Sequence, residues 1–209
     1  MKDNTVSYSF QSNEENFKQF PYHFFVKEDI SLQGNKATIA LHIINQDNKV
    51  MPFAPGHHTY YKVPLKEKHN LEVEDISLSN EEKRAWLDGE EVIKIPNPGN
   101  MKVIVPTIGT LTLTFDPKFK YLWLWSEKNK GFFCIEPVIT HPKNRETEAL
   151  QIQPNTEEEV SFSITLESND QTSNKPSNLK NTENILKNSP NIQQSDFTIE
   201  LGRSRESEF

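Results

Sequence analysis

Short runs of β-branched and aromatic residues follow one another along this chain, and turn residues separate them at close intervals. From about Tyr8 to Leu166 such runs are typical of strands. They are HFFVKEDISL, ATIALHIIN, MKVIVPTIG, TLTLTFD, KYLWLWSE, GFFCIEPVIT and EVSFSITLE. TLTLTF and SFSITL alternate apolar and polar residues, as half-buried antiparallel strands do. There is no internal repeat and no βαβ alternation, so the pattern predicts an all-β sandwich.

The punctuation between the runs supports separate strands. Good turn sequences lie at Gln33–Asn35, Asn97–Asn100 and Asp116–Pro117. The segment SNEEKRAWLDGEE differs, because Ser79 followed by Glu82 three residues later fits a capping box. We expect one or two helical turns there.

Composition divides the chain into two parts. Only 34% of the residues are hydrophobic, and residues 168–209 are dominated by Asn, Ser and charged groups. That segment cannot bury enough apolar surface to offset chain entropy, so we expect a disordered C-terminal tail. Residues 1–167 are enough for one domain with a sizeable core.

Several classes of protein are excluded. No apolar run is long enough for a membrane-spanning helix, and the start is too polar for a secretory signal. The single cysteine, Cys134, cannot build a disulfide framework or a thiolate zinc site. The net charge of −7 with scattered Lys and Arg argues against nucleic acid as the main partner, and nucleotide-binding glycine motifs are missing. We expect a cytoplasmic protein, since no Asn-x-Ser/Thr sequon occurs.

His58 stands out in MPFAPGHHTYY, where two prolines and a glycine precede an extended aromatic stretch. Adjacent side chains of an extended segment point to opposite faces. His57 and His58 therefore cannot easily ligate one metal ion, and we expect no metal site. The same alternation puts His58 on one face with Tyr60, a candidate substrate-binding residue. The alternative is a hydrogen-bonded loop histidine.

Glu136 lies in the almost wholly apolar run GFFCIEPVIT, on one strand face with Phe132 and Cys134. A buried charge without partners is very costly, so this carboxylate must be paired, protonated or catalytic. Desolvation would raise its pKa toward the range that suits a general base. Pro137 biases Glu136 toward an extended conformation. The alternative is a salt bridge to an Arg or Lys.

Asp88 and two tryptophans complete the candidates. Asp88 precedes a glycine in RAWLDGEE, which by itself is a turn signal. Trp123 and Trp125 in KYLWLWSE project from the same strand face. Paired tryptophans suit stacking on a sugar ring, so Trp125 is a candidate substrate-binding residue, although such pairs are more often part of a core.

Together these segments resemble the aldose 1-epimerase (galactose mutarotase-like) superfamily. MPFAPGHHTYYKVP is similar to the family's Pro-Phe-x-x-Gly-x-His-x-Tyr-Phe signature, and FFCIEPVITHP is similar to its Cys-x-Glu-Pro segment. IINQDNKVMPF fits the family's strand that ends in Asn before the signature. The likeness is strongest over residues 20–167, with both motifs in the family's order.

The resemblance implies an antiparallel supersandwich that interconverts the α and β anomers of a hexopyranose by ring opening, without a cofactor. It implies Glu136 as general base on the anomeric hydroxyl and His58 as proton donor to the ring oxygen, facing each other across a hexose-sized gap. Asp88 resembles the family's Leu-Asp aspartate, which holds sugar hydroxyls. The expected partner is a small sugar. A hexose phosphate is a variant, for which positive charge could come from Lys62, Lys66, Lys68 and Arg145.

Family members are longer at the front, which supplies early strands, an arginine and a histidine that contact the sugar. We therefore expect an N-terminally shortened sandwich with open strand edges and an uncovered apolar face. A separate chain could supply the missing part. Three hypotheses stay open: a mutarotase-type isomerase, a non-catalytic sugar-binding sandwich, and an inactive fragment. His58 together with Glu136 favours the first, and the missing front favours the other two.

Overall fold

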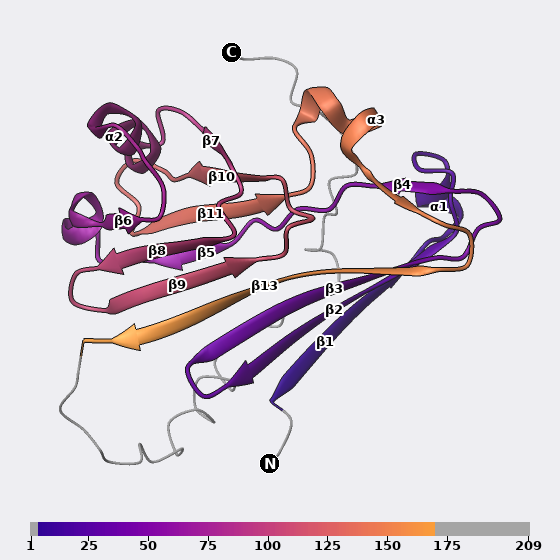
Figure 1. Cartoon of the computed structure of the whole chain (residues 1–209), viewed down its shortest axis with the longest axis horizontal. Helices are drawn as coiled ribbons and strands as arrows, with labels where there is room; N and C mark the ends of the chain where they lie inside the picture. The colour runs from indigo at the N-terminus through magenta and orange to yellow at the C-terminus, as the bar shows by residue number, and fades with distance from the viewer. Residues whose placement is uncertain (1–3, 170–209) are drawn as a thin grey trace.

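The computed structural model describes residues 4–169, which form two packed antiparallel sheets with few helices (Figure 1). The larger sheet has the strand order β1-β2-β3-β13-β9-β8-β6. Its strands are β1 (Thr5–Gln11), β2 (Phe24–Gln33), β3 (Lys36–Asn45), β6 (Glu72–Glu74), β8 (Asn100–Val105), β9 (Gly109–Phe115) and β13 (Glu157–Ser168). The smaller sheet has the order β5-β11-β10-β7. Its strands are β5 (Tyr60–Lys62), β7 (Ile93–Pro96), β10 (Tyr121–Trp125) and β11 (Phe132–Val138). A two-stranded ribbon pairs β4 (Met51–Phe53) with β12 (Leu150–Ile152).

The helices are short. They are α1 (Glu14–Phe17), α2 (Asn80–Asp88) and α3 (Arg145–Glu148), with 3₁₀ turns at Leu65–Asn70 and Pro142–Asn144. The predicted capping box begins α2: the Ser79 hydroxyl accepts from the Glu82 N–H at 3.1 Å, and the Glu82 carboxylate accepts from the Ser79 N–H at 2.8 Å. Gly89 ends the helix with φ 67°, a left-handed conformation that favours glycine. The Trp86 indole N–H then donates to the Trp125 carbonyl at 3.1 Å, which fixes α2 against the end of β10.

The prediction of an all-β sandwich is confirmed, and each of the seven predicted runs contains a strand. The sequence pattern missed the first residues of β1, which begins at Thr5 rather than near Tyr8. It also missed the short strands. β13 ends at Ser168, one residue past the predicted domain boundary. The rest of the predicted tail, residues 170–209, lies outside the described residues. No helix among the described residues is both long and apolar enough to cross a membrane.

Alternation along the strands builds the core between the sheets. Phe115 and Phe162 face inward from the larger sheet, and Leu124 and Phe133 face inward from the smaller one. All four are buried, as period-two patterning requires of the inner faces of a sandwich. Every second residue of the smaller sheet is thereby directed to its outer face.

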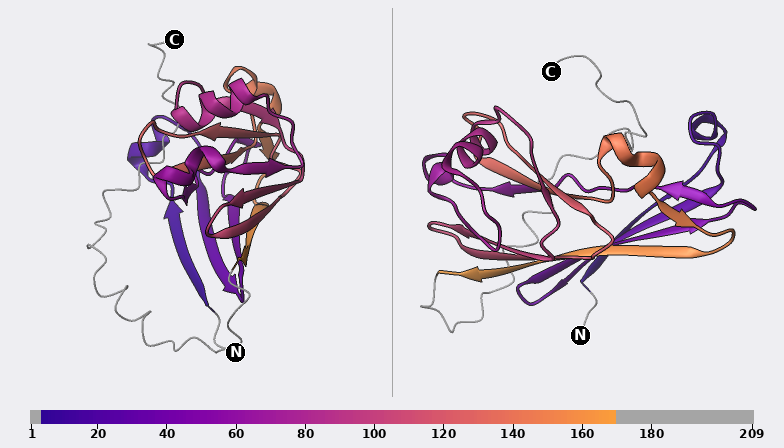
Figure 2. Two further views of the ribbon diagram at one scale, coloured as in Figure 1. Left: turned by 90° about the vertical axis from the view of Figure 1, so that its left-hand side faces the viewer. Right: turned by 45° about the horizontal axis from the view of Figure 1, so that its top comes forward.

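One part of the larger sheet is not covered. β1, β2 and β3 extend beyond the smaller sheet (Figures 1 and 2). There Val6 lies opposite Ile30, and both are exposed, as are Tyr8 and Leu32. β1 is also an edge strand. The sandwich therefore has an open edge beside an exposed apolar face.

Candidate active site

The loop before β5 runs alongside β11 because a glycine lets it approach closely. Gly56 forms an isolated antiparallel bridge with Val138, and the His57 N–H donates to the Pro137 carbonyl at 3.0 Å. A Cβ on Gly56 would lie 2.8 Å from Val138 Cγ1, closer than real Cβ atoms come. The loop therefore docks on β11 in one register, from which a larger residue would displace it.

This docking brings His58 and Glu136 together. Gly56 at one end of the loop, and Tyr60 opposite Cys134 at the other, fix the register. His58 therefore lies opposite Glu136 on the outer face of the smaller sheet. Its Nε2 atom is 3.2 Å from the Glu136 Oε1 atom. The structure joins the two residues predicted as acid and base, but in direct contact rather than across a hexose-sized gap.

Aromatic rings surround this pair. The His58 ring stacks on Tyr60, with centroids 4.7 Å apart and planes at 14°. The Trp125 ring meets His58 edge-on at 5.6 Å. Phe132 contacts Tyr60 at 5.1 Å and Trp125 at 5.9 Å between centroids. The two candidate substrate-binding residues Tyr60 and Trp125 thus lie beside the pair, and Tyr60 is 60% exposed.

Glu136 is only 8% exposed although it faces away from the core. Burial raises the pKa of Glu136 from its ordinary value of 4.5 to about 7. Among the described residues its ion-pair partner is His58, and not the Arg or Lys of the alternative interpretation. This carboxyl can therefore gain and lose its proton near neutral pH, as a general acid or base must.

The pKa of the half-exposed His58 side chain shifts in the opposite direction to that of Glu136. Burial lowers the pKa of His58 and outweighs an opposing hydrogen bond to its own backbone. Both shifts disfavour the charged forms, so the pair with one proton is favoured as a carboxylic acid beside a neutral imidazole. Moving that proton along the 3.2 Å contact gives a carboxylate beside an imidazolium.

Cys134 adds a third group to the site. It is fully buried on the same face of β11 as Glu136. Burial, and then the nearby Glu136 carboxylate, raise the pKa of Cys134 to about 12. Its sulfur, an imidazole nitrogen of His58 and a carboxylate oxygen of Glu136 all lie within 4.8 Å of one another. A set of soft and hard ligands is therefore grouped here, although the chain has one cysteine.

The sequence profile of the aldose 1-epimerase family matches residues 1–87, which include His58 and Tyr60 but end before Glu136. Comparison with curated proteins gives no match. Among solved structures, the Slr1438 protein from Synechocystis sp. superposes with a TM-score of 0.68 at 16% identity, over 80% of this chain and 63% of that one. The chain has the galactose mutarotase-like fold.

Two further mutarotase-like neighbours have the same fold. A galactose mutarotase related enzyme from Lactobacillus acidophilus gives a TM-score of 0.64 at 15% identity, over 79% of this chain and 68% of that one. A galactose mutarotase-like protein from Lactobacillus casei gives 0.63 at 19% identity, over 80% and 71%. The predicted resemblance to the aldose 1-epimerase superfamily is confirmed. The matched part spans less than two thirds of the Synechocystis chain.

Asp88 of this mutarotase-like chain is the last residue of α2 and pairs with His69, whose Nε2 atom is 3.4 Å from Asp88 Oδ1. Among the described residues no ion pair or hydrogen bond joins Asp88 to His58 or Glu136. Its predicted role in holding sugar hydroxyls stays a prediction.

Lys68 has a role that its position in the sequence did not indicate. It is 1% exposed, and its ammonium donates to the Glu127 carbonyl at 2.6 Å. It also lies 5.9 Å from the centre of the Phe132 ring, and burial lowers its pKa. Lys68 thus holds the β10–β11 turn in place beside the aromatic rings. Because Lys68 is buried, contacts to the phosphate of a hexose phosphate would have to come from exposed cations such as Lys62 and Lys66.

The site opens to solvent on the side of His58 and Tyr60, which are half exposed and 60% exposed, respectively. Two hollows, of about 350 and 170 Å³, lie beside α2, and neither is lined by His58 or Glu136. The larger one is lined by Glu72, Val73, Ile76, Ser77, Leu78 and Lys83. A ligand of the His58–Glu136 pair would therefore be held against the aromatic rings and remain partly solvated.

Proposed function

We propose that this chain is an aldose 1-epimerase-like isomerase, which interconverts the α and β anomers of a hexopyranose. The observation that carries the proposal is the contact between a half-exposed imidazole and a buried carboxyl on an aromatic sheet face. The epimerase profile over the region of His58 and the mutarotase-like fold support it.

The reaction needs proton transfers at two oxygens bonded to the same sugar carbon, so an adjacent acid and base suit it. The Glu136 carboxylate takes the proton of the anomeric hydroxyl while the His58 imidazolium donates one to the ring oxygen. The bond from the anomeric carbon to the ring oxygen breaks, and the former hydroxyl becomes a carbonyl. Rotation and the reverse transfers close the other anomer. Each positioned group typically supplies roughly 10²–10⁴-fold.

The sugar must first separate the two side chains, which are in contact without it. Glu136 lies on β11, the second strand from the edge of the smaller sheet, and is nearly buried. His58 lies in the preceding loop and is half exposed. We therefore expect the His58 side chain to move, with the ring faces of Tyr60 and Trp125 receiving the apolar side of the sugar.

A hexose phosphate is the narrower form of this substrate, and it would need cations near the sugar. The exposed Lys62, opposite Phe132 in the sheet, supports that form. A separate chain that completes the sandwich would find the exposed apolar side chains of β1 and β2.

A non-catalytic sugar-binding sandwich is the second candidate. The exposure of His58 favours it, because a half-solvated proton donor stabilises developing charge less than one in a dry site does. Polarimetry on freshly dissolved α-glucose and α-galactose separates the two. An isomerase accelerates the approach to anomeric equilibrium, and Glu136→Gln abolishes the acceleration while sugars still raise the unfolding temperature. A chain that sugars stabilise without any acceleration would instead be the binding module, and an acceleration unchanged by Glu136→Gln would remove Glu136 from the mechanism.

A further inference from the structure

The sequence predicts no metal site, because His57 and His58 point apart and one cysteine alone cannot hold zinc, but the fold brings His58 beside two possible ligands of β11. We propose that His58, Cys134 and Glu136 bind a thiophilic divalent cation such as Zn²⁺. Among the described residues, these three form the group of His, Cys, Asp or Glu side chains whose possible ligand atoms all lie within 4.8 Å of one another. Zinc takes nitrogen, oxygen and sulfur ligands at about 2.0–2.3 Å, so a cation among these atoms needs each to move by roughly half an ångström.

Strand geometry holds two of the three ligands. Cys134 and Glu136 are two residues apart on β11, so their side chains share one face. His58 reaches the same face from the docked loop opposite. Its half-exposed position leaves a fourth coordination place for water, as in zinc sites with three protein ligands. Because Cys134 is buried, the cation enters where His58 moves away from Glu136.

Charge also favours occupation. A thiolate, a carboxylate and a neutral imidazole around a divalent cation form a complex with no net charge. Such a complex avoids much of the penalty for burying any of these charges alone. On binding, the Cys134 thiol releases its proton to solvent, the His58–Glu136 pair releases the proton that it holds near neutral pH, and bonds from sulfur, oxygen and nitrogen to the metal form. No atom changes oxidation state.

The bound cation would occupy both groups that transfer protons to the sugar. Inhibition of mutarotation by Zn²⁺, reversed by a chelator, therefore rests on the proposed function. Cation binding itself does not.

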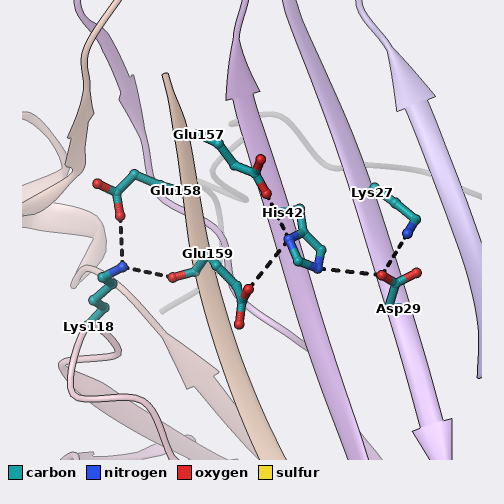
Figure 3. Close-up of polar contacts among 7 residues, drawn as sticks. All are labelled: Lys27, Asp29, His42, Lys118, Glu157, Glu158 and Glu159. Atoms are coloured by element: carbon teal, nitrogen blue, oxygen red, sulfur yellow. Dashed lines mark hydrogen bonds and ion pairs between the residues drawn. The ribbon is translucent and has the colours of Figure 1, made fainter. Parts of the chain in front are cut away.

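His42, on β3 of the larger sheet, provides a matched control (Figure 3). Its Nδ1 atom is 2.9 Å from Glu157 and 3.6 Å from Glu159, and its Nε2 atom is 3.5 Å from Asp29. These contacts offer nitrogen and oxygen but no sulfur. Any metal–thiolate signal must come from Cys134, since the chain has one cysteine.

The test uses the full-length chain, freed of metal with a chelator, and Co²⁺ as a spectroscopic substitute for Zn²⁺. We expect one equivalent of Co²⁺ to give a sulfur-to-cobalt charge-transfer band, which one equivalent of Zn²⁺ abolishes. The band should disappear in Cys134→Ser and stay unchanged in His42→Ala. In His58→Ala, affinity should fall by more than the roughly 10–100-fold that loss of a supporting partner causes.

Two results would overturn the site: Co²⁺ uptake by the native chain without the band, or equal affinity in native and His58→Ala chains. His58 is half exposed, so its variant decides the matter even where Cys134→Ser fails to fold. The two proposals fail separately. A chain with the band but without mutarotation contradicts the isomerase only, and one that accelerates mutarotation without the band contradicts the metal site only.

Discussion

Four histidine side chains among the described residues contact carboxylates, and two of these, His42 and His58, lie in different surroundings. His58 meets a single buried carboxyl, Glu136, among aromatic rings on the smaller sheet. His42 lies between acidic side chains of β2 and β13 on the outer face of the larger sheet, where Lys27 also pairs with Asp29 at 2.7 Å (Figure 3). The residue types are the same, but several carboxylates and a nearby lysine surround His42, whereas aromatic rings surround His58.

The carboxyl pKa values shift in opposite directions as a result. Burial raises the pKa of Glu136 to about 7. Hydrogen bonds from Lys27 and then Ser7 lower the pKa of Asp29. The environment, rather than the pairing of imidazole with carboxylate, therefore decides which group can exchange protons near neutral pH. The difference predicts catalysis at Glu136 and only surface electrostatics around His42.

The largest expected effect is the loss of mutarotation in Glu136→Gln. The amide cannot accept the hydroxyl proton, so the acceleration should fall by roughly 10²–10⁴-fold, to the level of the uncatalysed reaction. Glu157→Gln, which changes a carboxylate beside His42, should leave the rate unchanged. Polarimetry on both variants measures the two rates. Equal rates would contradict the difference inferred between the His58 and His42 sites.

The next effect is that of His58→Ala, which removes the donor to the ring oxygen. We expect a loss of roughly 10²-fold or more. Because His58 and Glu136 act as a unit, the double variant should be little slower than the slower single variant. NMR saturation transfer between the anomers measures these rates. A rate loss in the double variant equal to the product of the two single losses would show that the groups act independently.

The pH profile should be bell-shaped, because the reactive pair carries one proton. That proton is lost as the pH rises through about 7, and a second binds below the lowered pKa of His58. We expect kcat/KM, measured with a chelator present, to fall on both sides. A rate that only rises through pH 7 would mean that the carboxylate works without an imidazolium.

The sequence predicted much of the fold and both members of the pair. Alternation placed the main strands, and the apolar run around Glu136 marked a carboxyl whose burial would be costly. Apolar patterning could not give the register, which depends on the close approach of Gly56 to Val138. The direct contact in place of a gap follows from that register.

Other features had no local signal. Lys68 is buried by contact with a turn 59 residues away, whereas most lysines are exposed. Two of the carboxylates around His42, Glu157 and Glu159, come from β13, which is far from β3 in the chain and adjacent to it only in the sheet. Such groupings depend on strand order, and the sequence pattern predicts strands without their order.

A smaller effect concerns stability. The folded pKa of Glu136, about 7, lies above its ordinary value of 4.5, so the folded form holds the proton more tightly. The native chain is therefore destabilised progressively as the pH rises from 4.5 to 7. Above pH 7, Glu136→Gln should be more stable by about 1–3 kcal/mol, and below pH 4.5 the difference should vanish. Urea unfolding at pH 4 and pH 8 measures it, and a variant less stable than the native chain at pH 8 would contradict the burial argument.

The smallest effect has the opposite sign. The pKa of Asp29 is lowered, so its ionised form stabilises the fold above its ordinary pKa of 3.8, and that contribution is lost as the pH falls through the folded value. Asp29→Asn should therefore be slightly less stable than the native chain at pH 7. The difference should shrink in acid, and also at high salt, because the partner of Asp29, Lys27, is 43% exposed and the pair is open to screening. The same urea series at pH 7, with and without added salt, measures it. Both variants, Glu136→Gln and Asp29→Asn, replace a carboxylate by its amide, so opposite signs of their stability changes would follow from the surroundings of the two carboxyls. Equal signs would mean that pairing with histidine, and not solvent exposure, sets their ionisation.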